Sequence, residues 1–253
     1  MDVKLKRLEK APVIEALFDF DCDMPTKFSV EGHEDAFKAS YVADYPEVRV
    51  RFSETHQIQS GKDREASHNT QRTVDGYQFW NTEKNVLVQT RQQGFSFNKL
   101  RPYNTLDDYL SVIRLNWEKF VEIGQPIQLK TIRMRFINRI ELPLTAGTLE
   151  LKDYLRICPE LPDDSDLAFT SFYHQHEAVE KETGNVVSIV LATQAAAENH
   201  LPLIFDITVS STKVTEPDDW RGIEQQIATL RLLKNRMFAN TLTPTCLSLY
   251  QQP

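Results

Sequence analysis

The stretch Ile127–Leu142, IQLKTIRMRFINRIEL, lies almost at the midpoint of the 253-residue chain and organises the predicted fold. From Lys130 onward apolar and polar residues alternate, which is the period of a β-strand with one buried face. One face would carry Ile132, Met134, Phe136, Ile140 and Leu142. The other would carry Thr131, Arg133, Arg135, Ile137 and Arg139. The pattern predicts a strand with a core face and a basic face, long enough that we expect a bend or bulge within it.

A second alternating stretch, Val13–Asp23, has charges of the opposite sign. Its apolar face would carry Ile14, Ala16, Phe18, Phe20 and Cys22. Its other face would carry Glu15, Leu17, Asp19, Asp21 and Asp23. The two strands could therefore lie side by side with their charges paired, or the arginines could instead face an open concavity.

The remaining elements predict two halves, 1–125 and 126–253, each with the order β-α-β-β-β-α. In the first half the pattern predicts a helix at Phe28–Tyr41 with Ser29 as N-cap, and a strand at Glu47–Gln59 with Val48, Val50 and Phe52 inward. It predicts a hairpin of Tyr77–Trp80 with Val86–Gln92, whose second strand could continue through Gly94–Leu100. A long helix from Leu106 to Phe120, capped by Thr105, follows. Ser60–Gly76 lacks hydrophobic periodicity and is predicted to be a mobile loop.

The second half repeats this order. It predicts a short helix at Thr148–Cys158, strands at Leu167–Glu180, Val186–Ala195 and Leu203–Thr212, a long helix from Trp220 with Thr215 and Asp218 as a capping box, and a short strand at Cys246–Tyr250. The long helices open on Asp107-Asp108-Tyr109 and Asp218-Asp219-Trp220, and this agreement favours an internal duplication. The expected class is α+β, with antiparallel sheets that carry helices on one face and join as a saddle or a barrel.

Composition narrows the classes of function. The 36 Asp and Glu residues outnumber the 29 Lys and Arg residues, which argues against nucleic-acid binding by bulk charge. The charged start, MDVKLKRLEK, is not followed by an apolar signal segment, and no run is long enough to span a membrane. Three cysteines without a CxxC pair favour a reducing cytoplasm and predict neither zinc nor a redox dithiol.

The candidate ligand-binding surface is the sheet face opposite to the helices. Its predicted residues are Arg133, Arg135, Arg139, Arg49, Arg51, Glu15 and Asp19. Opposite charges there could simply pair across strands. Alternatively, clustered arginines on a curved sheet could bind phosphate or carboxylate groups.

Three functions are compatible with such a face. Alternating acids and bases resemble, loosely, the closed tunnel of triphosphate-processing, metal-dependent phosphohydrolases, although the Glu-x-Glu-x-Lys signature of that family is absent from Glu15-Ala16-Leu17-Phe18-Asp19. Single-stranded nucleic acid could bind over Arg133, Arg135 and Arg49. The third function is a non-enzymatic interaction module.

Other motifs are weak. His174-Gln175-His176 places two imidazoles on one strand face, but the sequence spacing implies no third ligand, so no metal site is predicted. The chain contains no GxGxxG, Walker-type loop, GxSxG or HExxH, and only eight glycines. We therefore expect no cofactor and identify no catalytic residue.

Four segments resemble an uncharacterised, sporadically distributed bacterial protein family of about this length. They are Ala11–Ala16, Phe95–Leu100 with Pro102-Tyr103, Arg133–Ile140 and Leu233–Phe238. The resemblance implies a bacterial cytoplasmic protein and a link to mobile or defence-associated genes, with no known activity. Together with the missing catalytic motifs, it favours a binding module that acts with a partner protein, as an accessory or neutralising subunit of a defence or toxin system. A homo-oligomer is compatible with this expectation, and no membrane association is expected.

Overall fold

The computed structural model describes residues 8, 10–61, 64–145, 147–160, 170–197 and 199–251, without the side chains of 56–61 and 64–69. These residues form an antiparallel sheet of nine strands in the order β2-β3-β4-β5-β1-β6-β9-β8-β7. The strands are β1 (Val13–Asp23), β2 (Glu47–Gly61), β3 (Arg64–Trp80), β4 (Val86–Arg91), β5 (Gly94–Leu100), β6 (Gln128–Pro143), β7 (Tyr173–Val179), β8 (Val186–Thr193) and β9 (His200–Ser211). The helices are α1 (Glu34–Tyr41), α2 (Asp107–Gly124), α3 (Trp220–Thr241) and α4 (Pro244–Ser248), with 3₁₀ turns η1 (Glu31–His33) and η2 (Leu151–Asp153).

The two stretches that dominated the sequence form the centre of the sheet. β1 and β6 are antiparallel neighbours. Each is followed along the chain by a meander whose last strand returns beside it, β5 beside β1 and β9 beside β6. The outermost strands, β2 and β7, lie at opposite edges, so the sheet is open and the predicted barrel is wrong.

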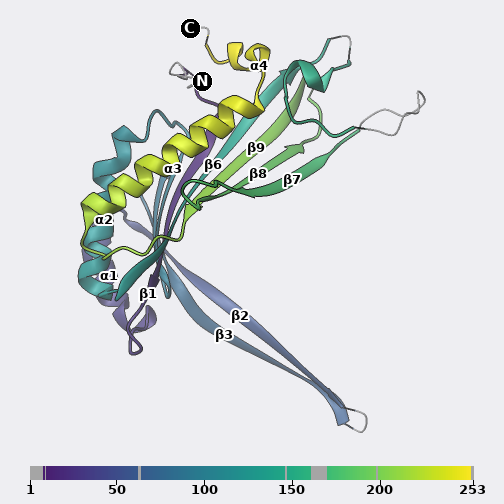
Figure 1. The fold of residues 1–253 in the computed structure, drawn as a ribbon. Helices are drawn as coiled ribbons and strands as arrows, with labels where there is room; N and C mark the ends of the chain where they lie inside the picture. Colours follow the sequence, from purple (N-terminus) through teal and green to yellow (C-terminus); the bar gives the residue numbers. More distant parts are fainter. Residues whose placement is uncertain are drawn as a thin grey trace.

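Helices cover one face of this sheet, as Figure 1 shows for α1, α2 and α3. The alternation in β6 follows the prediction, because Ile132, Met134, Phe136, Ile140 and Leu142 are all buried under the helices. In the first half the core is aromatic. Its central indole, Trp117 of α2, packs at 5.0 Å edge-on to Phe20 and donates through Nε1 to the carbonyl of Pro217 at 2.8 Å. This hydrogen bond ties α2 to the loop before α3.

The predicted irregularity in the central pair is confirmed as two bulges. The register between β1 and β6 shifts between Val13 and Glu15, and again between Asp21 and Cys22. The first shift inserts Ile14 into β1, and the second inserts Lys130 into β6. Extra residues of this kind increase the local twist of a sheet.

The first half differs from the prediction at Ser60–Gly76. Arg64–Gly76 belongs to β3, which pairs with β2 as a long two-stranded ribbon. Within the stretch Ser60–Gly76, only residues 62 and 63 lie outside the described residues. Figure 1 shows this ribbon projecting from the body of the protein. Val50 and Phe52 lie on the predicted face but are 41% and 43% exposed, because the core does not extend that far along β2. The predicted hairpin of Tyr77–Trp80 with Val86–Gln92 is confirmed as the end of β3 paired with β4. Gly94–Leu100 does not continue that second strand but turns back as β5, so the described part of this half has five strands.

A bulge marks the start of the ribbon. Arg51 pairs with Gly76, whereas the next residue, Phe52, pairs with Val74. Asp75 is therefore the extra residue on β3. β3 also pairs with β4 from Gly76 to Trp80, so the bulge lies where the ribbon leaves the sheet.

Local details of the second half also differ. Only Leu151–Asp153 of the predicted helix at 148–158 is helical, and it is a 3₁₀ turn. Strand β7 starts at Tyr173, and residues 167–169 of the longer predicted strand lie outside the described residues. The cap of α3 is Asp219, which accepts from the Gly222 amide, in place of the predicted box. The tail forms helix α4 because Thr243 caps it and Pro244 occupies its first turn, which corrects the predicted strand.

The first half shows two similar differences. The predicted helix from Phe28 is helical only from Glu31, although Ser29 Oγ does accept from the Gly32 amide at 3.3 Å. Leu106, without a side-chain hydrogen bond, occupies the N-cap of α2 in place of Thr105. The Thr105 amide instead donates to Asp108 Oδ2 at 3.3 Å.

Two glycines with positive φ give a matched test of this packing. A Cβ on Gly94 (φ +147°) would lie 1.9 Å from the carbonyl oxygen of Phe20, whereas a Cβ on Gly184 (φ +74°) would meet nothing within 4 Å. Gly184→Ala should lower the free energy of unfolding by about 1 kcal/mol, the cost of the backbone conformation alone. Gly94→Ala should cost about 3 kcal/mol or more, because β1 and β5 must also separate. Urea denaturation measures both, and equal losses would contradict the close approach.

Candidate functional site

The open sheet face, opposite to the helices, contains the predicted site residues of the central strands. On β1 and β6 every second side chain points to this face, and the register places Asp19 directly opposite Arg133. Asp19 is only 6% exposed although no helix covers it. The neighbouring long side chains exclude water from its carboxylate.

Asp19 lies at the centre of an ionic network. Its Oδ2 accepts from Arg133 Nη1 at 2.7 Å, and its Oδ1 accepts from Ser96 Oγ at 2.6 Å and from Arg91 Nη2. Asp21 adds a further contact to Arg91 at 3.1 Å. Asp19 and Asp21 of β1 thus neutralise two arginines. Arg133 lies on the neighbouring strand β6, and Arg91 lies on β4, with β5 between it and β1.

A second pair joins β6 to β9. Arg135 donates from Nε and Nη2 to Asp206 Oδ2 at 2.8 and 2.6 Å. The Asp206 side chain is 10% exposed, and hydrogen bonding to it raises the pKa of Arg135. The predicted ligand-binding guanidinium is therefore held by a carboxylate of the protein itself.

Glu15 ends a chain of polar side chains that crosses four strands. Gln78 on β3 donates to Gln89 at 3.1 Å, Gln89 donates to Asn98 at 3.0 Å, and Asn98 donates to Glu15 at 2.6 Å. Gln89 and Asn98 are buried. Buried amides that each donate to the next residue in the chain order the open face.

The other three predicted residues lie elsewhere. Arg139 pairs with its own strand neighbour Glu141 at 2.7 Å. Arg49 and Arg51 lie on β2, four strands from β1 and so about 19 Å away at about 4.8 Å per strand. They pair with Glu47 (2.9 Å from Arg49 Nε) and Asp75 (3.0 Å). The structure thus gathers Arg133, Arg135, Glu15 and Asp19 and leaves Arg139, Arg49 and Arg51 apart.

This geometry supports the first of the two interpretations, cross-strand pairing. Within the part of the chain that the structure describes, no group of three or more His, Cys, Asp or Glu side chains is arranged to hold a metal ion. Three residues of this network, Ser96, Asn98 and Gln89, were not among the site residues predicted from the sequence. Polar residues at alternate positions of β4 and β5 were the available signal, because an uncovered sheet face has this pattern.

A second cluster lies on the helix-covered face, where the four family-like segments meet. We call it the aromatic ladder: Tyr109, Tyr103 and Phe136, with ring centroids 5.7 and 5.9 Å apart, and a lysine at each end. Lys99 Nζ lies 5.7 Å from the Tyr109 ring, and Lys234 Nζ lies 4.3 Å from the Phe136 ring. Such contacts favour the charged form of an amine only modestly.

Lys234 is the more unusual of the two amines. It is half-buried between α3 and β6, and no ion pair among the described residues includes it. The neighbouring Arg231 is itself held by Asp107 at 2.7 Å. Burial, and secondarily Arg231, lowers the pKa of Lys234 to about 8. Arg236, farther along the same helix, pairs with Glu180.

Comparison with protein-family models, with curated proteins and with solved structures gives no match. The resemblance of the four segments to a bacterial family therefore stays a prediction.

Removing the Asp19 carboxylate tests whether the open face is a structural network. Asp19→Ala should lower the free energy of unfolding by about 3 kcal/mol, because Arg91 and Arg133 would be left without their buried partner. Glu141→Ala is the matched control, since it breaks a solvent-exposed pair with Arg139 worth under about 1 kcal/mol. Urea denaturation would count against the network if both variants lost the same small amount.

Lys234 should make stability depend on pH in alkaline solution. Its amine has a lower pKa in the folded protein, about 8, than the ordinary 10.5 expected of the unfolded chain. Protonation therefore favours the unfolded state, and this penalty is fully present below pH 8 and disappears as the pH rises toward 10.5.

The variant Lys234→Met keeps the length of the side chain and removes the charge. We expect it to raise the free energy of unfolding by about 1 kcal/mol at pH 7, after the lost contact with Phe136 is subtracted. The gain should shrink by pH 9.5, measured by urea denaturation at both values. A difference that does not change with pH would contradict the lowered pKa.

Proposed function

We propose that the protein is a non-enzymatic binding module, and that the β2–β3 ribbon contacts a partner protein. The observation that carries this proposal is the isolation of the ribbon. Beyond the bulge at Asp75, the described residues of β2 and β3 have strand pairing only with each other. A two-stranded ribbon of this kind is marginally stable in water without further packing. A partner surface would supply that packing.

The side chains near the base of the ribbon suit recognition. Phe52, Val74 and Arg72 share one face, and the guanidinium carbon of Arg72 lies 3.7 Å from the centre of the Phe52 ring. Phe52 is 43% exposed. An exposed aromatic ring stacked with arginine combines the two residue types most enriched at protein interfaces. Among the described residues β2 is an edge strand with no strand neighbour on its outer side, which suits strand addition by a partner.

The alternative functions have less support from the geometry. The two edges of the described sheet do not meet, so these strands form no tunnel of the triphosphatase type. The arginines of the open face are paired with carboxylates, which weakens them as contacts for phosphate or single-stranded nucleic acid. Protein recognition by the ribbon requires neither a tunnel nor unpaired arginines.

The duplication and the saddle belong to this proposal. Support comes from the mirrored strand order about the β1–β6 junction, with each central strand paired to the last strand of its own meander. The numbers of strands differ, five and four, and the ribbon belongs to one half alone. A duplicated scaffold in which one copy acquired an arm fits a binding role.

No helix among the described residues is long and apolar enough to cross a membrane. The cytoplasmic location and the link to a defence or toxin system stay predictions from the sequence.

Site-specific photocrosslinking in cells of the native host tests the partner. A benzophenone amino acid replaces Phe52 in one variant and Leu232, which is 71% exposed on α3, in the control. We expect a discrete crosslinked species of higher mass from position 52 and none of that mass from position 232. The same pattern at both positions, or none at position 52, would overturn the proposal.

A shortened ribbon supplies a second test. Residues 54–72 are removed, and Ser53 and Thr73, which pair across the ribbon, are joined by an Asn-Gly turn. Because this segment pairs with no other strand, the thermal midpoint of the body should stay within a few degrees of the intact protein. The species crosslinked through a benzophenone at Phe52 should weaken or disappear.

A further inference from the structure

Strand β7 places two imidazoles beside each other. His174 pairs with Leu191 of β8 and His176 pairs with Ile189, in a ladder that is regular from Tyr173 to Val179. Since Leu191 and Ile189 are buried, both histidines point to the helix-covered face. They lie at its margin and remain half-buried, because β7 is the outermost strand. Figure 1 shows β7 at the edge of the sheet.

The separation of the two rings fits a common metal ion. His174 Nε2 and His176 Nδ1 are 3.1 Å apart, and the rings are inclined by 66°. Two nitrogens each about 2.05 Å from one ion, at ligand angles of about 90–109°, are about 2.9–3.3 Å apart. The observed separation lies within this range. The regular strand therefore already provides the spacing that a chelate needs.

The hydrogen bonding of the pair is compatible with ligation. A metal ion requires both facing nitrogens to be free of protons. In the absence of metal, one ring nitrogen donates a hydrogen bond to the other, and the direction depends on the tautomers. A shift of tautomer frees both facing nitrogens without a net loss of protons.

Among the described residues, no ion pair or hydrogen bond joins either histidine to a charged side chain. Glu180 is the next ionisable residue on the same face of the β7 end, and its carboxylate is engaged by Arg236 and Thr183. The outer side of β7 has no strand partner among the described residues, so a small ion can approach from the edge. Water molecules can complete its coordination shell.

We propose that His174 and His176 form a two-imidazole binding site for a divalent transition-metal ion, with water at the remaining coordination positions. Imidazole ligands suit Ni²⁺, Cu²⁺ and Zn²⁺ rather than Mg²⁺ or Ca²⁺. The site lies at the opposite edge of the sheet from the β2–β3 ribbon and does not depend on the partner proposed for that ribbon.

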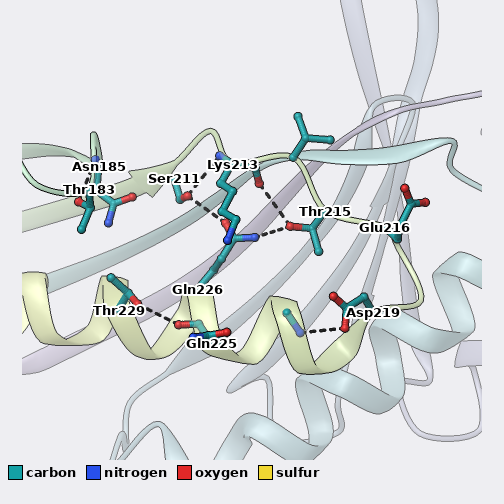
Figure 2. Close-up of a pocket in the computed structure, with 12 residues that line it drawn as sticks. Thr183, Asn185, Ser211, Lys213, Thr215, Glu216, Asp219, Gln225, Gln226 and Thr229 are labelled. Atoms are coloured by element: carbon teal, nitrogen blue, oxygen red, sulfur yellow. Dashed lines mark hydrogen bonds between the residues drawn. The ribbon is translucent and has the colours of Figure 1, made fainter.

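A polar pocket of about 490 Å³ lies beside α3 and the loop after β9. Figure 2 shows side chains that line it, and neither histidine is among the lining residues. Its inner side chains already bond to one another, as in the contact from Ser211 Oγ to Gln226 Oε1 at 2.9 Å. The pocket is therefore not part of the proposed metal site.

Calorimetric titration of the untagged full-length protein with Ni²⁺ tests the site and avoids the thiol oxidation that Cu²⁺ would promote. We expect one equivalent to bind. Loss of even an outer-shell partner typically weakens metal affinity about 10–100-fold, so His174→Ala and His176→Ala should each weaken it about tenfold or more. His200→Ala and His33→Ala, at histidines outside the pair, should leave the affinity unchanged.

Imidazole ¹⁵N spectra with Zn²⁺ supply an independent readout. Resonances of His174 Nε2 and His176 Nδ1 should shift together, while those of His200 stay in place. Circular dichroism verifies that each variant is folded. Retention of the full Ni²⁺ affinity by the double variant His174→Ala, His176→Ala would overturn the proposal. Absence of binding to the wild-type chain, or equal weakening by His200→Ala, would overturn it as well.

Discussion

The pairing of β1 with β6 is the constraint on which the rest of the structure depends. It joins two meanders that have no other strand contact in the described sheet. Its register sets Asp19 opposite Arg133 on one face and Phe18 opposite Met134 on the other. A slip of one residue would expose the aromatic side and bury the charged one. Charge pairing and apolar burial therefore specify the same alignment.

Neutralisation at this seam also shapes what the protein can do. An acidic strand and a basic strand placed far apart would each attract ligands of opposite charge. Side by side, Asp19 and Asp21 of β1 pair with Arg133 of β6, and the Asp19 side chain is only 7% exposed. The most conspicuous charge pattern in the sequence thus serves to hold the sheet together. The proposed binding of a partner or a metal ion therefore takes place at the two edges of the sheet, on the projecting ribbon and on β7.

The sequence predicted the central strands well because both have one fully buried face. Val13–Asp23 agrees with the structure, and Ile127–Leu142 differs by one residue at each end. The site residues on these strands, such as Asp19 and Arg135, were placed on the correct face, but their partners depend on strand neighbours distant in sequence. The ribbon was missed because residues 60–76 have no apolar alternation, although β3 pairs with β2 there and residues 70–73 have exposed side chains. The cap of α3 was misplaced because several polar residues compete at its terminus, and α2 starts one residue later than predicted, with Leu106 at the N-cap.

The bulge at Asp75 sets the phase of the β2–β3 ribbon, that is, which side chains of the two strands share a face beyond the bulge. With this one extra residue on β3, Val74 rather than Asp75 lies across from Phe52, so the two faces of the ribbon differ in chemistry. Residues added or removed in cross-strand pairs farther out would preserve that phase and leave the nine-stranded sheet untouched. The length of the arm can therefore vary in evolution independently of the body, while its orientation stays encoded at a single position.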